Sequence, residues 1–279
     1  MRGDAKSSDG STPASCAIAV MAKASYPGRT KTRLVPPLTF DEAAAFNTAF
    51  LQDVAANIGS ADRQANSRWG SGIAGYMAFG PPESKPFFRE VLPVSIGLID
   101  AWHPNFGDCL FTTVEELLAL GHGSAVVLNS DSPTLPTALL VEAAEVLARP
   151  GDRAVLGPST DGGYYLLGLK LPHRRLFEDV AWSTEAVARQ TLERAAEIGL
   201  DVHVLLPWYD VDDIVALRLL RSELCDGISF APALTPHRAT HTSQLFSVLL
   251  RETDIAQRLA CDAKDLADLA DPFRQRAAE

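Results

Sequence analysis

One short stretch, residues 124–136, constrains the fold more than any other part of the chain. Its residues 125–128 form an unbroken apolar run, which is typical of a strand covered on both faces of a parallel sheet. Polar residues and a proline follow at once, and a helical pattern resumes near Thr137. Ligands of open α/β sheets bind just past the carboxyl ends of the strands, so Asp131 is a candidate to hold a divalent metal ion or a ligand hydroxyl. It could equally cap the next helix, as aspartate often does.

Length and charge limit the classes of protein that this chain can belong to. Its 279 residues are 47% apolar, which suits one large domain, alone or with an extension. The net charge of −10 argues against nucleic acid or an anionic membrane as a partner, because both would be repelled. The apolar runs are too short to span a bilayer, and four scattered cysteines indicate neither a disulfide framework nor a zinc site. We expect a cytoplasmic protein with a disordered tail at residues 1–15.

A basic loop follows the first predicted strand, residues 16–22. No acidic residue occurs between Asp9 and Asp41, although the chain as a whole is acidic. The loop contains four cations and a glycine, namely Lys23, Gly28, Arg29, Lys31 and Arg33. Arginine forks and lysine point charges pair well with phosphate oxygens, and glycine lets backbone amides approach a ligand. The loop therefore predicts a di- or triphosphate site, with a solvated basic loop as the alternative.

Two further acidic segments follow predicted strands. Asp161 precedes two glycines between the strands predicted at residues 153–157 and 164–169, so it belongs either to an ordinary hairpin turn or to the floor of a small-ligand site. Asp210 and Asp212 follow a core strand predicted at residues 202–206. Asp212 could cap the next helix, or one of the two carboxylates could point toward Asp131.

The remaining periodicity predicts an alternating α/β chain. A GxGxxG pattern at residues 70–75 follows a polar stretch and precedes a strand-like run, so we interpret it as a flexible loop and not as a dinucleotide site. The other predicted elements are a strand at 94–99, helices at 39–59, 113–121, 137–147, 183–198 and 214–224, and C-terminal helices at 244–250 and 255–269.

The basic loop, the lone Asp131 and the Asp-x-Asp segment are all predicted to lie at the carboxyl ends of strands. Independent helix caps would not be expected to coincide with a phosphate-type loop. We therefore expect a nucleotide phosphate held between cations and a carboxylate-bound Mg²⁺ or Mn²⁺, since both ions favour oxygen ligands.

Five segments carry a resemblance to a known family. They are KAxxPGRxKTRL at residues 23–34, SDxPxLP at 130–136, GPxxDGGYY at 157–165, WST at 182–184 and DVD at 210–212. In order and spacing they resemble the bacterial DUF2064 family, also described as rSAM/selenodomain-associated transferase 1, of the nucleotide-diphospho-sugar transferase superfamily. The resemblance implies a GT-A fold, which is a three-layer α/β/α sandwich with a mostly parallel central sheet, and transfer chemistry on a nucleotide or nucleotide-sugar.

The resemblance covers about residues 17–220, so we expect a transferase domain at 16–224 and a helical extension at 225–279 that could form a homodimer. It implies roles for individual residues. The residues expected to bind substrate or nucleotide phosphate are Lys23, Gly28, Arg29, Lys31, Arg33, Ser130, Gly162, Gly163 and Tyr164. The expected catalytic residues are Asp161, Lys31 and Arg33. The metal ion is expected to be held by Asp131 with Asp210 or Asp212.

One segment departs from the family pattern. Family members carry Gly-Asp-Leu-Gly-x-Arg where this chain has GDCLFT at residues 107–112. The second glycine and the arginine are missing, so an altered activity is a possible outcome.

Three functions stay open at this point. In nucleotidyl transfer, an acceptor oxygen attacks the α-phosphorus of a nucleoside triphosphate and pyrophosphate leaves. In glycosyl transfer, the diphosphate of a nucleotide-sugar leaves and Asp161 is the base on the hydroxyl of a small acceptor. The third function is a catalytically degenerate domain that binds nucleotide as a sensor.

Overall fold

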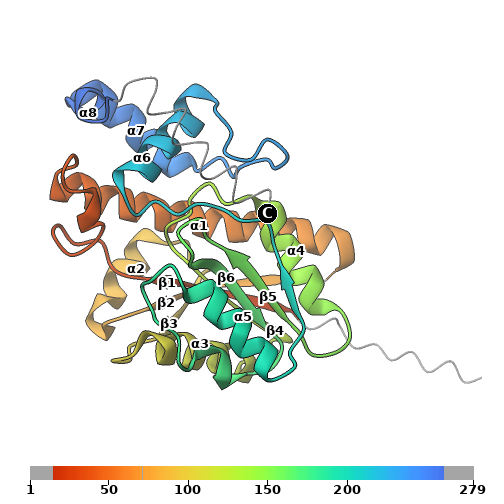
Figure 1. Ribbon diagram of the computed structural model, residues 1–279. Helices are drawn as coiled ribbons and strands as arrows, with labels where there is room; N and C mark the ends of the chain where they lie inside the picture. Colours follow the sequence, from red (N-terminus) through yellow and green to blue (C-terminus); the bar gives the residue numbers. More distant parts are fainter. Residues whose placement is uncertain (1–14, 71, 261–279) are drawn as a thin grey trace, which may run out of the picture.

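A mostly parallel sheet forms the centre of the protein (Figure 1). The computed structural model describes residues 15–70 and 72–260. Its seven strands lie in the order β3-β2-β1-β4-β6-β5-β7; β6 is antiparallel to both of its neighbours, and the other neighbouring pairs are parallel. The strands are β1 Cys16–Ala22, β2 Ile73–Phe79, β3 Gly97–Asp100, β4 Ser124–Leu128, β5 Ala154–Pro158, β6 Tyr164–Leu169 and β7 Val202–Val204.

Helices cover both faces of the sheet, so the predicted three-layer α/β/α sandwich is confirmed (Figure 1). α1 and α4 cover one face, and α3 and α5 cover the other. α6, α7 and α8 lie beyond α1, on its side away from the sheet. The helices are α1 Phe40–Trp69, α2 Lys85–Val91, α3 Phe106–Ala119, α4 Thr137–Ala148, α5 Val187–Glu197, α6 Ile214–Arg221, α7 Thr240–Glu252 and α8 Ile255–Arg258, with short turns at η1 Thr32–Leu34, η2 Pro82–Ser84, η3 Arg174–Phe177 and η4 Ser222–Asp226.

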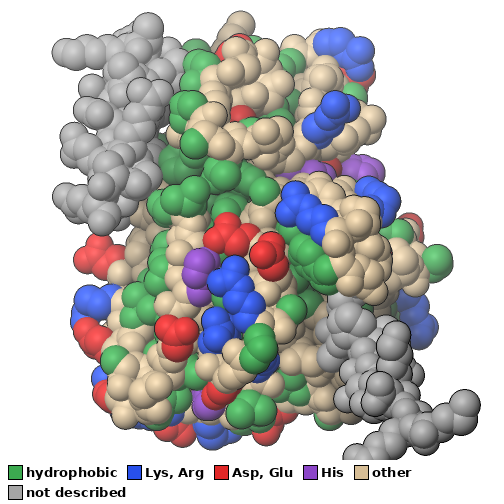
Figure 2. Space-filling view, turned by 90° about the vertical axis from the view of Figure 1, so that its right-hand side faces the viewer, with side chains coloured by type: hydrophobic (Ala, Val, Ile, Leu, Met, Phe, Trp, Pro, Cys, Tyr) green, Lys and Arg blue, Asp and Glu red, His purple; other side chains and the backbone are tan. Residues whose placement is uncertain are grey.

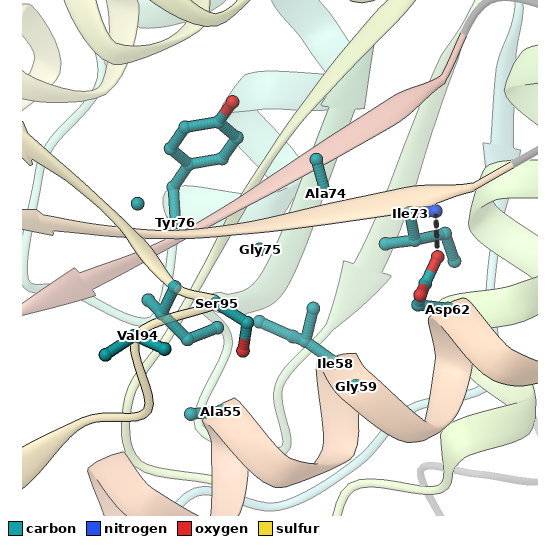
Figure 3. A pocket seen from close by; sticks show the side chains of 12 residues that line it. Ala55, Ile58, Gly59, Asp62, Ile73, Ala74, Gly75, Tyr76, Val94 and Ser95 are labelled. Carbon is teal, nitrogen blue, oxygen red and sulfur yellow. Dashed lines mark hydrogen bonds between the residues drawn. The ribbon is translucent and has the colours of Figure 1, made fainter.

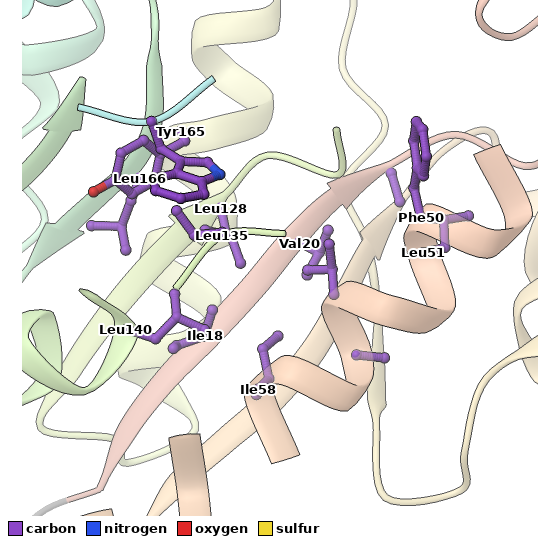
Figure 4. Packing of buried hydrophobic residues seen from close by; sticks show 14 of the residues in the cluster. Ile18, Val20, Phe50, Leu51, Ile58, Leu128, Leu135, Leu140, Tyr165 and Leu166 are labelled. Carbon is purple, nitrogen blue, oxygen red and sulfur yellow. The ribbon is translucent and has the colours of Figure 1, made fainter. Parts of the chain in front are cut away.

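Alternation of side chains along the central strands divides the core into two layers. Ile18 and Val20 of β1 pack on the α1 side, together with Phe50 and Ile58 of that helix (Figure 4). Ala17 of the same strand belongs to the layer that α3 and α5 cover. Because both faces of the strand are buried, its sequence is a continuous apolar run with no polar alternation.

α1 is longer than the sequence indicates. The predicted capping box is confirmed, since Thr39 Oγ1 accepts from the Glu42 amide and Glu42 accepts from the Thr39 amide. The predicted end at Gly59 is wrong, because the helix continues to Trp69. Gly70 ends it in the left-handed conformation, with a φ of 70°.

The loop predicted at residues 70–75 is wrong over its second half, because Ile73 to Gly75 are part of β2. A Cβ at Gly75 would lie 2.7 Å from the Ile96 side chain and 3.0 Å from that of Ile58. This glycine therefore serves close packing of β2 against α1 and the segment before β3.

Two helices begin at other residues than predicted. α3 begins at Phe106, where the Asn105 side chain accepts from the Gly107 amide, and Thr113 lies inside the helix with its hydroxyl bonded to the Cys109 carbonyl. Ser183 does not cap α5, which begins four residues later; it adopts a φ of 65° in the preceding turn.

Two strand predictions need smaller corrections. The strand predicted at residues 94–99 is β3, shifted toward Asp100. β7 is an edge strand of three residues and not a core strand, and Val204 and Leu206 are half exposed.

The C-terminal helices are tied to α1 by polar and aromatic contacts. The Asp53 carboxylate, fully buried in α1, accepts from the amides of His241 and Thr242 and from the Thr242 hydroxyl at the start of α7. Arg258 of α8 donates to both carboxylate oxygens of Glu42, at 2.6 and 2.8 Å. α7 thus confirms the helix predicted at 244–250, whereas residues 261–269 of the next predicted helix, like the predicted tail at 1–14, lie outside the described residues.

Within the described residues, no helix is both long and apolar enough to cross a bilayer. The face seen in Figure 2 carries acidic and basic side chains interspersed with apolar ones, so neither sign of charge covers it alone.

Candidate active site

The strand order changes direction between β1 and β4, and the rim formed by their carboxyl ends is called here the β1–β4 crevice. β2 and β3 lie on one side of β1, and β4 lies on the other, so the connections that leave the carboxyl ends of β1 and β4 diverge. Such a reversal of strand order is where open α/β sheets bind their ligands. The basic loop, residues 23–35, follows β1, and the segment of Asp131 follows β4.

Lys31 connects the basic loop to both acidic segments. Its ammonium lies 2.8 Å from Asp131 Oδ1 and 2.8 Å from Asp212 Oδ1, and it donates to the Val211 carbonyl oxygen at 2.8 Å. Only 5% of the Lys31 side chain is exposed, and its ammonium lies 5.6 Å from the centre of the Phe50 ring. All three ammonium protons therefore have acceptors within the protein.

Backbone contacts hold the two acidic segments side by side. The Val211 amide donates to the Asp131 carbonyl oxygen at 2.8 Å, and the Ser132 hydroxyl donates to the Tyr209 carbonyl oxygen at 2.9 Å. Neither candidate carboxylate is a helix cap: α4 has no side-chain cap, and Asp213 caps α6 through the Ala216 amide. The capping alternatives for Asp131 and Asp212 are therefore wrong.

Four carboxylates share this part of the crevice. Burial, and then the charges of Asp161, Asp212 and Asp131, raise the pKa of Asp210 to about 8. Burial and the three neighbouring carboxylates therefore both favour the protonated form of Asp210.

Two cations, Lys31 and Arg33, offset part of the negative charge of these carboxylates. Burial alone would raise the pKa of Asp212, but Lys31 and then Arg33 outweigh it and hold that pKa below its usual value. Burial likewise works against the charge of Lys31, but Asp131 and Asp212 together keep its pKa above the ordinary range. Arg33 therefore lies close enough to Asp212 to act on it, on the same side of the sheet as Asp131.

The other predicted cations are open to solvent. Lys23, Arg29 and Arg33 are exposed, and none of them forms an ion pair with a described residue. Gly28 is exposed in the left-handed conformation, with a φ of 75°. The loop thus presents three unpaired cations to solvent, whereas its fourth cation, Lys31, is buried.

The hairpin residues lie at the same rim. Asp161 is exposed and accepts from the Gly163 amide at 2.8 Å, so the predicted hairpin turn is present. Gly162 has a φ of 92°, and a Cβ there would collide with the backbone of Glu185. The Ser130 hydroxyl donates to Asp131 Oδ1 at 2.9 Å.

The Tyr164 side chain packs against the core. Its ring packs against the core layer under α3 and α5, and its hydroxyl is buried without a hydrogen-bond partner among the described residues. Burial raises the pKa of this phenol.

A buried network behind the carboxylates has no signal in the sequence. The Tyr209 hydroxyl donates to Glu223 Oε2 at 2.7 Å and lies 3.0 Å from the Thr134 hydroxyl. Burial raises the pKa of Glu223. Contacts between residues so far apart in the chain cannot be inferred from spacing.

The departure from the family pattern lies in the first turns of α3. Gly107 packs against the Trp182 indole, Asp108 pairs with Arg174 at 2.9 Å, and Leu110 is buried in the core. The residue that replaces the family's second glycine thus serves helix packing.

The carboxylate oxygens at this rim are of the kind that a hard divalent ion binds, but they are not arranged around a common point. Within residues 15–70 and 72–260, no three His, Cys, Asp or Glu side chains are arranged to hold a metal ion. The Lys31 ammonium contacts one oxygen of Asp131 and one of Asp212, the carboxylates that the sequence predicts to bind such an ion.

A hollow of about 370 Å³ lies away from this rim, between α1 and the β2–β3 edge (Figure 3). Its carboxylate, Asp62, already accepts from the Ile73 amide at 2.8 Å. Apolar side chains such as Ile58 and Val94 form much of the remaining wall, so the hollow lacks the charged groups of the β1–β4 crevice.

Comparison with solved structures identifies the fold. A candidate nucleotide-diphospho-sugar transferase from Desulfovibrio desulfuricans G20 superposes with a TM-score of 0.67 at 24% identity, over 85% of this chain and 97% of its own. Two other structures are more distant. A CMP:2-keto-3-deoxy-manno-octonic acid synthetase in complex with CTP superposes with a TM-score of 0.49 at 12% identity, over 77% of this chain and 100% of its own. A cytidylyltransferase from Leptospira borgpetersenii superposes with a TM-score of 0.46 at 10% identity, over 85% of this chain and 94% of its own. The superposition on the first of these structures shows that the chain has the nucleotide-diphospho-sugar transferase fold.

Part of the sequence also matches a family model. Residues 70–184 match the DUF2064 family, which is described as an uncharacterized protein conserved in bacteria. The resemblance to DUF2064 is thereby confirmed over these residues. No curated protein sequence matches the chain.

Proposed function

We propose that this protein is a divalent-metal-dependent transferase that acts on a nucleotide at the β1–β4 crevice. The contact of Lys31 with both Asp131 and Asp212 supports this proposal most directly, because it joins the basic loop to two acidic segments at one point. The two carboxylates are 26% and 44% exposed, so a ligand can reach them from solvent.

The phosphates bind to the loop after β1. Lys23, Arg29 and Arg33 are exposed and unpaired, and Gly28 leaves room for phosphate oxygens beside the backbone. Three free cations suit a highly charged group, which favours a nucleoside triphosphate as the substrate.

Asp131, Asp210 and Asp212 are the residues that would hold Mg²⁺ or Mn²⁺. When bound, the ion offsets negative charge on the reacting phosphoryl group. Asp210 lies near Asp131, Asp161 and Asp212, and a cation there would offset the negative charge of these carboxylates.

Nucleotidyl transfer is the first candidate reaction. An acceptor oxygen forms a bond to the α-phosphorus, the bond from that phosphorus to the bridging oxygen breaks, and pyrophosphate leaves with the electron pair. The acceptor, if a hydroxyl, gives its proton to a base at the rim. Arg29 and Arg33 stabilise the charge that builds up on the leaving pyrophosphate.

Glycosyl transfer from a nucleotide-sugar is the second candidate, and the position of Asp161 favours it. This exposed carboxylate lies close enough to Asp210 to raise the pKa of that residue, and so has the location of a base for an acceptor hydroxyl.

Products distinguish these functions. The protein is incubated with Mn²⁺ and each nucleoside triphosphate or common nucleotide-sugar, and with small hydroxyl and phosphate acceptors. Binding is followed by thermal shift and products by ³¹P NMR on quenched, metal-free samples. Pyrophosphate indicates nucleotidyl transfer, free nucleoside diphosphate indicates glycosyl transfer, and binding without turnover indicates the sensor function. Absence of both binding and products contradicts the proposal.

A further inference from the structure

Lys31 is the one cation of the basic loop that is buried and already paired. Its three donors are already used by Asp131, Asp212 and Val211, and its side chain is almost fully buried. Its backbone has a φ of 52° and a ψ of 35°, a left-handed conformation that costs free energy in a residue with a Cβ. The buried contacts of the ammonium therefore hold the loop in a conformation that it would not adopt by local preference.

The carboxylates that bind Lys31 are those proposed to bind the metal ion. Asp131 Oδ1 accepts from both Lys31 and Ser130, and Asp212 Oδ1 accepts from Lys31. A divalent ion on the same oxygens would lie within a few ångströms of the ammonium, where the two positive charges repel each other. Lys31 already pairs with both carboxylates, and among the described residues no three His, Cys, Asp or Glu side chains are arranged to hold an ion.

We propose that Lys31 is an internal counter-ion that competes with the divalent metal ion for Asp131 and Asp212, and that nucleotide phosphates release it. This inference rests on the proposed function, since it concerns the same metal ion and phosphates. Phosphate oxygens bound by Arg29 and Arg33 of the same loop offer Lys31 the acceptors that it loses to the metal ion.

A linkage between the two ligands follows. Free metal ion binds weakly because it must displace Lys31 without giving it a new partner. Phosphate provides that partner, so metal ion and phosphate each strengthen the binding of the other by the same factor. The protein thereby selects the metal–nucleotide complex over free metal ion.

Substitution of the lysine tests the competition. Lys31→Gln and Lys31→Met remove the charge, and Lys170→Met removes one positive charge at a partly exposed position that contacts the Arg149 carbonyl, outside the crevice. Binding of Mn²⁺ alone is measured from the loss of the free-ion signal in electron paramagnetic resonance. Both Lys31 variants should bind Mn²⁺ at least about tenfold more tightly than the wild type and Lys170→Met. Equal or weaker binding overturns the inference.

Linkage is measured with inorganic tripolyphosphate as the probe. In the wild type and in Lys170→Met, Mg²⁺ should raise tripolyphosphate affinity in calorimetric titrations more than it does in Lys31→Gln. If the effect of Mg²⁺ is the same in all three proteins, the inference fails while the proposed function stands. If no protein binds metal ion even with tripolyphosphate, the proposed metal-dependent function fails as well.

A measurement on the wild type keeps the test independent of variant folding. A buried lysine ammonium exchanges its protons slowly and gives a separate ¹H–¹⁵N signal. Addition of Mg²⁺ with tripolyphosphate should shift that signal or broaden it away, and addition of Mg²⁺ alone should do so only at much higher concentration. A signal that is unchanged by the two ligands together contradicts release of Lys31.

Discussion

Lys31 shows that a charged side chain in a sequence can indicate a charged region of the protein without indicating which group that side chain pairs with. The sequence predicts that Lys31 binds phosphate, because it lies among other cations after a strand. In the structure its ammonium is buried between two carboxylates that lie 100 and 181 residues further along the chain. A pattern along the chain records that a cation is present, but the acceptor is set by how the strands are ordered.

Arg33 is expected to bind phosphate, since it is exposed, unpaired and close enough to Asp212 to lower the pKa of that residue. Arg33→Ala should weaken nucleotide binding about tenfold, as expected for loss of one charge-assisted hydrogen bond. Calorimetric titration with nucleotide and Mg²⁺ measures this. Arg63→Ala, a change on the exposed surface of α1, is the control. Equal affinities in wild type and Arg33→Ala would remove Arg33 from the site.

Asp131 is expected to be a metal ligand. Asp131→Asn keeps the shape of the side chain but removes its charge, so the protein should lose the dependence of nucleotide binding on Mn²⁺. The exposed Asp201→Asn is the matched control, and it should titrate like the wild type. A normal Mn²⁺ titration of Asp131→Asn would refute the ligand role.

Among elements, the central strands could be predicted from sequence and several helix starts could not. β1 and β4 are buried on both faces, so their continuous apolar runs identify them. The start predicted for α3 is wrong because Thr113 and Glu116 have the spacing of a capping box, while the true cap is Asn105. Short polar residues near a helix start are common, and only the fold decides which of them is the cap.

The start of α7 depends on a residue of another helix. Ala239 precedes α7 and offers no side-chain cap, so Asp53 of α1 supplies the acceptor. Asp53→Ala leaves buried donors unsatisfied and should lower the free energy of unfolding by about 3 kcal/mol. Asp53→Asn retains one acceptor oxygen and should cost less. Urea denaturation measures both, and an unchanged midpoint for Asp53→Ala would show that α7 does not need this cap.

At the scale of the whole molecule, the C-terminal helices pack on the same core as α1 and the sheet. Phe46 of α1 and Phe246 of α7 have ring centres 4.7 Å apart, and Arg258 joins the end of the described chain to the start of α1. Glu223, just after α6, meets Tyr209 beside the crevice. We expect residues 225–260 to unfold together with the sheet in one transition.

The ion pair between Glu42 and Arg258 predicts a pH dependence of stability. Hydrogen bonds from Arg258 hold the pKa of Glu42 below its usual value of 4.5. A lowered folded-state pKa adds stability that is complete above the unfolded pKa and is lost as the pH falls through the folded pKa. Arg258→Gln should therefore cost roughly 1 to 3 kcal/mol at pH 7, and the difference from wild type should narrow below about pH 4.

Urea denaturation across this pH range measures the effect. Arg251→Gln, on the exposed surface of α7, is the control, and its difference from wild type should be small at every pH. A deficit in Arg258→Gln that is the same at pH 3 and pH 7 would contradict an electrostatic origin.

The most direct test of the proposed site is a crystal structure of the protein with Mn²⁺ and a nucleoside triphosphate or nucleotide-sugar. The anomalous signal of manganese should lie at coordination distance from an oxygen of Asp131 and from Asp210 or Asp212, with the phosphates against Arg29 and Arg33. An ion bound elsewhere, or a nucleotide seated in the hollow beside Ile58 and Tyr76, would contradict it.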